Sequence, residues 1–194
     1  MASCRQHAAG PLGADPLELG ADSGPEALAH QGWMGRLLRR AERVGEAGEI
    51  PVAAVVLDER GRAIGWGSNR RERDQQPLAH AELVALQQAA RLRQDWRFNG
   101  CTLLVTLEPC PMCAGALVQA RMGRVVFGAG DPKRGALGGC LNLAADASAH
   151  HHMVVTGGVL AEACGAQLEG WFRRRRRQRR EPPSGRPAAP APAG

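Results

Sequence analysis

The chain has 194 residues, 44% of them hydrophobic, and a formal net charge of +6, which suits one globular domain with a core and tails. The longest apolar runs, such as residues 52–57 and 102–107, are only strand-sized, so no membrane span is expected. The first thirty residues hold four acidic residues, a single arginine and no apolar stretch. This composition argues against a secretory or transit segment and predicts a cytoplasmic protein.

The positive charge is concentrated near the C-terminal end. Seven arginines occupy the eight positions 173–180, and without them the chain would carry a charge of −1. Such a run is commonly a solvated tail. The alternative is a phosphate-binding appendage, because guanidinium groups match phosphate oxygens and displace counterions on binding.

The first half of the chain begins with an Ala-, Gly- and Pro-rich segment, residues 1–32, which we expect to be a disordered extension. Apolar residues then recur at helical spacing over residues 33–47. Residues 51–57 and 62–67 flank a turn ending in Gly61 and predict a β-hairpin. Residues 79–93, which contain no Gly or Pro, predict a second helix.

The second half predicts a strand at 102–107, a helix at 110–122 and a strand at 124–127, an order that implies parallel pairing through a crossover. A Gly-rich connection, residues 128–149, follows, and loops of that length are often functional. A strand at 153–156 and a helix at 160–177 complete the pattern. We therefore expect one domain over residues 33–177, an α/β fold with a five-stranded mixed sheet and helices on both faces. Residues 178–194 are expected to be a basic, then Pro/Ala-rich, disordered tail.

Two short segments carry the candidate chemistry: His80-Ala-Glu82 and Pro109-Cys110-Pro-Met-Cys113, each at the start of a predicted helix. Cysteines three apart share a helix face, and a helix N-terminus favours the thiolate. Two thiolates and one imidazole are three ligands, and zinc prefers four. A catalytic zinc site leaves the fourth position to water, so His80, Cys110 and Cys113 predict such a site.

Glu82 lies two residues from His80 on the same predicted helix, where the two side chains diverge, so it is not expected to bind the metal. A site with two thiolates is formally neutral and acidifies water less than a three-histidine site, so a nearby base is needed. Glu82 is that base by position, and the H-x-E…P-C-x-x-C pattern is the known signature of zinc-dependent nucleobase deaminases. A buried core histidine, an exposed glutamate and a redox C-x-x-C are the separate alternatives.

Two other protein classes remain open. A purely structural zinc module would need a fourth ligand, which only the run His150–His152 could supply. A non-catalytic RNA-binding subunit would not need Glu82. The four cysteines outside the motif, Cys4, Cys101, Cys140 and Cys164, are expected to be ordinary thiols.

Longer stretches around the motif resemble the bacterial tRNA-specific adenosine deaminases. The matching segments are Pro77–Glu82, Thr106–Leu117, Arg124–Ala129, Glu49–Val52, Asn69, Asp131–Lys133 and Gly135–Ala136. The resemblance covers about residues 33–178 and implies the cytidine deaminase fold, with three α/β/α layers, one zinc ion per subunit and a homodimer. It also implies that the wobble adenosine of a tRNA anticodon is converted to inosine.

The resemblance assigns zinc binding to His80, Cys110 and Cys113, and proton donation to Glu82. It implies that Asn69 contacts the flipped nucleoside and that Asp131 and Lys133 lie in a loop that touches the flanking RNA. The sequence departs from the family at Ala53, where glycine is common, and in residues 70–74, which lack a customary proline. These departures leave open an alternative substrate, a free base or nucleotide such as cytosine, guanine or deoxycytidylate.

Overall fold

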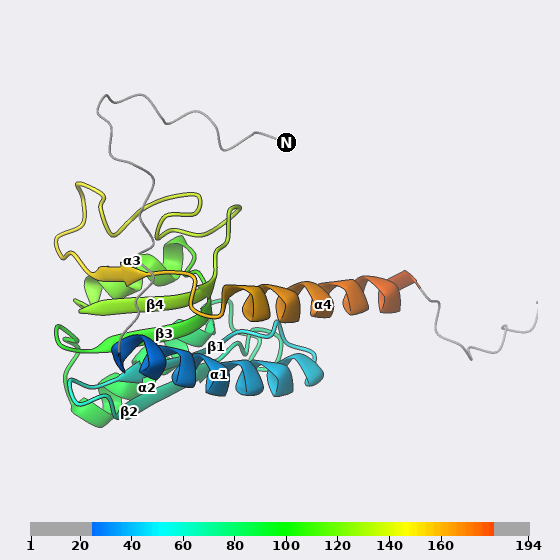
Figure 1. Cartoon of the computed structure of the whole chain (residues 1–194), viewed down its shortest axis with the longest axis horizontal. Coiled ribbons are helices and arrows are strands. Elements are labelled where there is room, and N and C mark those ends of the chain that lie inside the picture. Colours follow the sequence, from blue (N-terminus) through cyan, green and yellow to red (C-terminus); the bar gives the residue numbers. More distant parts are fainter. Residues whose placement is uncertain (1–24, 181–194) are drawn as a thin grey trace, which may run out of the picture.

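The computed structural model describes residues 25–180, which form a five-stranded sheet in the order β2-β1-β3-β4-β5 (Figure 1). The strands are β1 (Ala53–Leu57), β2 (Ala63–Ser68), β3 (Thr102–Leu107), β4 (Arg124–Ala129) and β5 (Val154–Thr156). β1 runs antiparallel to both β2 and β3, whereas β3, β4 and β5 are mutually parallel. The predicted mixed sheet, its hairpin and its parallel crossover are confirmed.

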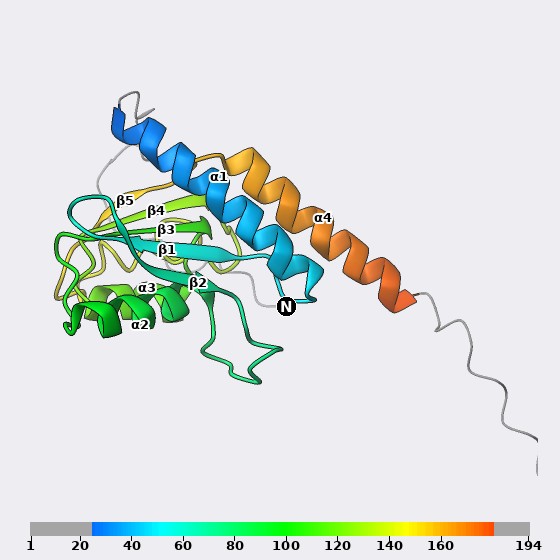
Figure 2. The same cartoon turned by 90° about the horizontal axis from the view of Figure 1, so that it is seen from below.

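Four helices cover the sheet in two layers (Figure 2). They are α1 (Pro25–Glu46), α2 (Ala81–Arg93), α3 (Pro111–Gln119) and α4 (Ala161–Arg180). α1 and α4 lie on one face of the sheet, and α2 and α3 lie on the other. The predicted three-layer α/β/α fold is therefore confirmed.

Two helices extend beyond their predicted bounds. α1 begins at Pro25, so residues 25–32, which we expected in the N-terminal extension, are helical. The buried Ala27, His30, Met34 and Leu37 recur every three or four residues, and this face extends the helix through an Ala- and Gly-rich stretch. α4 runs to Arg180, three residues past its predicted end. The rest of the predicted extension and tail, residues 1–24 and 181–194, lies outside the described residues.

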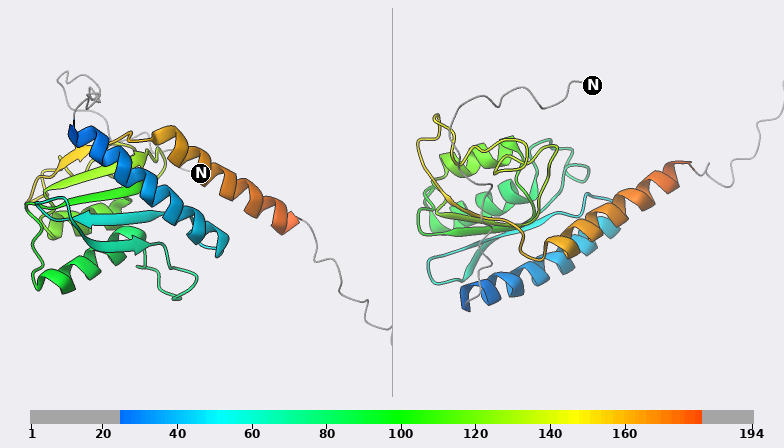
Figure 3. Two further views of the ribbon diagram at one scale, coloured as in Figure 1. Left: turned by 60° about the horizontal axis from the view of Figure 1, so that its bottom comes forward. Right: turned by 45° about the horizontal axis from the view of Figure 1, so that its top comes forward.

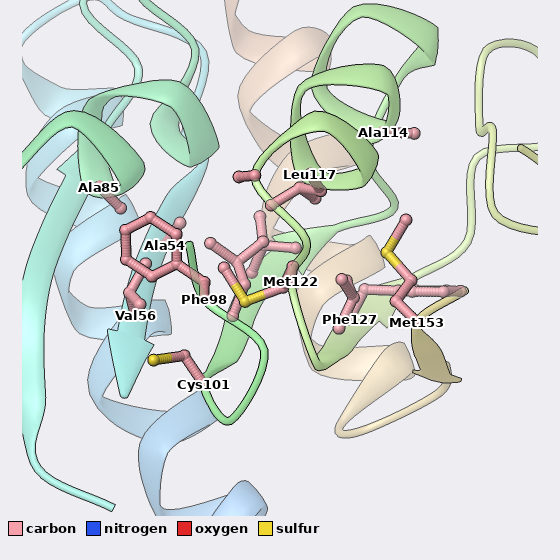
Figure 4. Packing of buried hydrophobic residues seen from close by; sticks show 14 of the residues in the cluster. Ala54, Val56, Ala85, Phe98, Cys101, Ala114, Leu117, Met122, Phe127 and Met153 are labelled. Atoms are coloured by element: carbon pink, nitrogen blue, oxygen red, sulfur yellow. The ribbon is translucent and has the colours of Figure 1, made fainter. Parts of the chain in front are cut away.

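Two hydrophobic clusters hold the layers together, one on each face of the sheet. The cluster under α2 and α3 includes Phe98, Leu117 and Met122, all at most 1% exposed, and Figure 4 shows them meeting between the sheet and these helices. Each large side chain buried in this way contributes roughly 1.5–3 kcal/mol. The cluster under α1 and α4 is built around Met34, Leu37 and Leu104.

α4 lies beside α1 on its face of the sheet, and its C-terminal part projects past the sheet (Figure 3). Two side chains of α4 attach it to the backbone of α1. Gln167 Nε2 donates to the Leu38 carbonyl at 3.0 Å, and Trp171 Nε1 donates to the Gly45 carbonyl at 2.9 Å. None of the described helices is both long and apolar enough to cross a bilayer.

Candidate active site

The candidate site lies at one edge of the sheet, where three strands end. β2 and β3 both run antiparallel to β1, so β2, β3 and β4 point in the same direction. Asn69 follows the end of β2, Glu108 the end of β3, and Asp131 comes two residues after β4. In open α/β sheets, ligands bind beyond the carboxyl ends of parallel strands, and this edge collects the polar side chains.

The start of α2 is held close to the sheet by two glycines of β2. A Cβ on Gly65 would lie 2.2 Å from the Ala85 carbonyl oxygen, and one on Gly67 would lie 1.8 Å from that of Ala81. Only glycine permits this approach, because backbone atoms cannot yield to a side chain. The close contact fixes the first turn of α2, where His80 and Glu82 lie.

His80 and Cys110 occupy equivalent positions, each the N-cap of its helix with extended backbone and no side-chain capping bond. Pro111 fills the first turn of α3, where a proline needs no hydrogen-bond donor. The two side chains are therefore not engaged in capping, and both are directed to a shared point with Cys113 one turn later.

The ring nitrogen of His80 and the sulfurs of Cys110 and Cys113 all lie within 4.8 Å of one another. His80 Nδ1 is 3.5 Å from Cys113 Sγ and 3.7 Å from Cys110 Sγ. Zinc bonds of about 2.3 Å to sulfur and about 2.0 Å to nitrogen put neighbouring ligands of a tetrahedron about 3.5 Å apart. The three side chains therefore have the donor types and the spacing for a zinc ion.

The protonation states of this cluster are shifted by burial and by mutual contact. The Cys113 thiol donates to Cys110 and, with the nearby imidazole, lowers the pKa of Cys110 to about 3. The same sharing, together with burial, raises the pKa of Cys113, and the Cys110 contact raises that of His80. Glu82 is 5% exposed, and burial raises the pKa of its carboxyl group. A buried carboxyl that takes up a proton more readily than usual is suited to proton transfer.

A pocket of about 190 Å³ opens above the cluster. Its lining comprises Ile50, Val52, Asn69, Arg71, His80, Ala81, Glu82, Leu107, Glu108, Cys110, Asp131, Arg134, Leu168 and Phe172. Its apolar lining comes from the segment before β1, from the end of β3 and from α4, and its polar lining comes from the start of α2 and from the segments that follow β2, β3 and β4. The pocket has room for a single base, so a larger substrate would have to insert one residue into it.

The three predicted substrate-contacting residues lie in different surroundings. Asn69 is 6% exposed, and its Nδ2 donates to Glu49 Oε2 at 3.1 Å. Asp131 also lines the pocket. Lys133 is exposed and does not line it; the cation that does so from this loop is Arg134, which we did not single out from the sequence.

Two buried carboxylates were also missed as positioning groups. Glu49 holds Asn69 and accepts the backbone N–H of Arg73 at 2.8 Å. Glu108 accepts three backbone N–H groups of the Gly-rich loop, from Asp131 at 2.9 Å, Leu137 at 3.0 Å and Gly139 at 2.8 Å. The available signal was an acidic residue placed directly before the Pro-Cys motif, at the end of an apolar strand.

The histidine run is not part of the cluster. His151 Nε2 contacts the Met122 carbonyl oxygen at 2.8 Å, and His152 Nδ1 contacts that of Ala144 at 3.1 Å. Within residues 25–180, the candidate metal group contains only the three predicted ligands. A four-ligand structural site built with this run is therefore not supported.

A second hollow of about 280 Å³ adjoins the pocket and shares Ile50, Asn69, Arg71 and Phe172 with it. Its other side is formed by α4, through Trp171, Arg175, Arg176 and Arg179. Part of the arginine run therefore lies beside the mouth of the pocket.

The chain matches known proteins over most of its length. The cytidine and deoxycytidylate deaminase zinc-binding region matches residues 28–129. The chain is 43% identical over 141 residues to the tRNA-specific adenosine deaminase of Bacillus subtilis, covering 73% of this chain and 87% of that protein. The protein of the same name from Haemophilus influenzae is 44% identical over 137 residues, covering 71% and 79%.

Solved structures of deaminases are also similar to this chain. A structure from a study of A-to-I editing by tRNA:A34 deaminases aligns with a TM-score of 0.67 and 34% identity, over 70% of this chain and 98% of that one. A guanine deaminase from Nitrosomonas europaea, at a TM-score of 0.61 and 24% identity over 83% of this chain and 98% of that one, shares the fold. The chain therefore belongs to the cytidine and deoxycytidylate deaminase family of zinc-dependent hydrolytic deaminases, and within it to the tRNA-specific adenosine deaminases.

Proposed function

We propose that this protein hydrolyses the wobble adenosine of a tRNA anticodon to inosine, with release of ammonia. The observation that carries the proposal is the buried Glu82 beside the His80–Cys110–Cys113 cluster, at the base of a pocket sized for one nucleobase. The tRNA deaminase relatives support an RNA substrate over a free base. An anticodon loop suits such a pocket, because an unpaired base costs less to turn out than one in a duplex.

In this proposal His80, Cys110 and Cys113 hold one zinc ion per subunit, and the C-x-x-C turn and the neutral imidazole supply the donors. Bound zinc supplies Lewis acidity, which makes water a nucleophile at neutral pH. The distances of 3.5 and 3.7 Å from His80 Nδ1 to the two sulfurs support this ligand set.

Glu82 moves the protons. It takes one from the attacking water and delivers one to a ring nitrogen of adenine, so that C6 accepts the oxygen. It then takes the remaining proton from the new C6 hydroxyl group and delivers it to the amino group, so that the C6–N bond breaks, ammonia leaves and C6 keeps the oxygen as a carbonyl. Its burial supports this role, because burial raises the pKa of the carboxyl group and so favours its uptake of a proton from water.

Asn69 and Asp131 are proposed to contact the nucleoside. The bond from Asn69 Nδ2 to Glu49 directs the carbonyl oxygen Oδ1 away from Glu49, where it can accept a hydroxyl or amino hydrogen. Lys133 is exposed, so its proposed contact is with RNA outside the pocket.

The arginines beside the pocket support a polyanionic substrate over a neutral free base. Arg71 and Arg134 line the pocket, and Arg175, Arg176 and Arg179 line the hollow next to it. In our proposal these groups hold phosphates on either side of the flipped nucleotide. The family resemblance further supports a homodimer, and the tRNA substrate supports a cytoplasmic location.

The decisive experiment is incubation of the zinc-loaded protein with total tRNA, followed by sequencing that detects adenosine-to-inosine conversion. Inosine at the wobble position is the expected result. Free adenosine, cytosine, guanine and deoxycytidylate are assayed for ammonia release in parallel. Deamination of one of these with an unchanged tRNA pool would replace the proposal by the free-substrate alternative.

A further inference from the structure

A separate hollow of about 720 Å³ lies at the β2 edge of the sheet, between α1 and α2. Its lining combines six arginines with an indole: Arg36, Arg39, Arg40, Arg43, Arg70, Arg91 and Trp66. We call it the arginine groove. Val84, Gln87 and Gln88 of α2 complete the lining, and among the described residues no acidic side chain contributes to it.

The groove follows from the way α1 packs. Met34, Leu37 and Ala41 are buried against the sheet, so residues 36, 39, 40 and 43 fall along the flank that faces β2. At 1.5 Å per residue, Arg36 and Arg43 are about 10 Å apart along the helix axis, enough to reach more than one phosphate of a nucleic acid strand. Arg70 and Arg91 supply charge from the other side.

These charges form no ion pairs with the carboxylates of residues 25–180. By contrast, five other arginines of the described chain do form ion pairs with carboxylates. Burial, together with repulsion from Arg70 and Arg43, lowers the pKa of Arg40. A cluster that repels itself is stabilised by an anion bound from solution.

The groove adjoins the active site through consecutive residues. Arg70 lines the groove, whereas Asn69 and Arg71 line the pocket. The backbone N–H of Arg70 donates to the Ala79 carbonyl at 3.0 Å, directly before His80. The pocket and the groove are therefore lined by consecutive residues of one segment, residues 69–71.

The edge strand β2 beneath the groove is protected at Trp66 against pairing with an added strand. The backbone N–H of Trp66 donates to Gln88 Oε1 at 2.6 Å, so this point of the edge is not open to another strand.

The groove also contains an aromatic ring. The indole of Trp66 lies 5.6 Å from the Arg40 guanidinium and 5.8 Å from the ring of Trp33. An indole among arginines is the combination that nucleic-acid surfaces use for bases and phosphates.

We propose that the arginine groove is a second RNA-binding surface, which holds backbone phosphates of the substrate away from the flipped base. This inference rests on the proposed tRNA substrate and extends it. A second copy of this chain is a poor occupant, because two-fold pairing of the groove would bring arginines against arginines.

The test compares two triple variants with equal charge loss. R39Q/R43Q/R91Q removes three exposed groove arginines, and R60Q/R97Q/R121Q removes three exposed arginines that do not line the groove. Glutamine keeps helix propensity, and circular dichroism with thermal melting checks that both variants fold. Binding of full-length tRNA is measured from roughly 50 to 200 mM salt, with inorganic pyrophosphate as a competing ligand. Sedimentation reports the oligomeric state.

The groove variant is expected to bind tRNA about tenfold more weakly, and its slope of log affinity against log salt should fall by about three. The control variant should lose much less tRNA affinity, and its salt slope should change less. Equal losses in both variants, or an altered oligomeric state of the groove variant alone, would overturn the inference. If pyrophosphate binds the groove with an affinity similar to that of tRNA, the ligand of the groove would instead be a free polyphosphate. If the groove variant alone loses tRNA affinity but the wild-type protein forms no inosine, the groove remains an RNA-binding surface and the proposed function is wrong.

Discussion

The carboxylate of Glu108 accepts the backbone N–H of Asp131 at 2.9 Å and joins the end of β3 to the loop that follows β4. Its other oxygen accepts Leu137 and Gly139. Glu108→Ala would leave three backbone N–H groups without their partner, so the free energy of unfolding should fall by about 3 kcal/mol or more. Urea denaturation measures this loss.

Glu108→Gln is the informative companion. Its single oxygen can still accept Leu137 and Gly139, but its amino group would face the N–H of Asp131. We expect roughly half the loss caused by alanine, and a raised KM for tRNA because Asp131 lines the pocket. Glu162→Gln, an exposed change at the start of α4, serves as the control. An alanine variant as stable as the wild type would mean that this carboxylate does not hold the loop.

Glu82→Gln should separate proton transfer from metal binding. The amide has the shape of the carboxyl group but cannot carry a proton between water and base, so inosine formation should fall by at least about 100-fold. Zinc measured by elemental analysis should stay near one ion per chain, because Glu82 is not among the three proposed ligands. Retained turnover would remove Glu82 from the mechanism. Loss of zinc would instead make it a support of the metal cluster.

The cysteines should differ in reactivity once the protein is stripped of metal by a chelator. The pKa of Cys110 is lowered to about 3, so it is a thiolate at pH 7, whereas burial raises the pKa of Cys101 and Cys164 to about 11. Iodoacetamide should therefore modify Cys110 first, as read by peptide mass spectrometry. Added zinc should protect it. Equal labelling of Cys101 and Cys110, or no protection by zinc, would contradict the assignment.

Local sequence patterns were sufficient for most elements and for the grouping of His80, Cys110 and Cys113. Strands such as 102–107 show as short apolar runs, and the two halves of the H-x-E…P-C-x-x-C pattern each sit at a helix start that propensity and proline placement reveal. The start of α1 was missed, because residues 25–32 have a composition that is also typical of unstructured segments. Ala27 and His30 are buried against the folded domain, and this tertiary contact stabilises residues 25–32 as helix.

Features that depend on contacts between distant residues could not be predicted. Glu108 bonds to residues 23 to 31 positions away, and nothing in its neighbourhood specifies these partners. The arginine groove combines α1 with Arg70 and Arg91, which the sheet order brings together at its β2 edge. The sequence instead drew attention to the dense run at residues 173–180, of which only some members line the hollow beside the pocket.

That run provides a further prediction. R175Q/R176Q/R179Q removes the arginines of α4 that line the hollow, and R173Q/R174Q/R180Q removes the same charge from the same helix at positions that do not. The first variant should weaken tRNA binding more and reduce the salt slope by up to about three. Binding curves at several salt concentrations measure the difference. Equal losses of tRNA affinity in both variants would indicate that the arginines act through their total charge and not through their position. Unchanged affinity in both variants would indicate that the run does not contact tRNA.

The turn between β1 and β2 should show a defined pH dependence through Asp58. The Arg62 guanidinium, together with the backbone N–H groups of Arg60 and Arg62, holds the pKa of this carboxyl below its usual value. The stabilisation from this carboxylate is fully present above the unfolded-state pKa of about 4 and is lost as the pH falls through the lower folded-state value.

Asp58→Asn should therefore lower the free energy of unfolding by about 1 kcal/mol at pH 7, a modest amount because Arg62 is exposed. The gap to the wild type should shrink as the pH is lowered below about 4, because the wild type then loses the same interaction. Urea denaturation at several pH values measures the gap, and Glu169→Gln, an exposed change on α4, is the control. A gap that stays constant from neutral to acidic pH would show that the charge of Asp58 does not stabilise the turn.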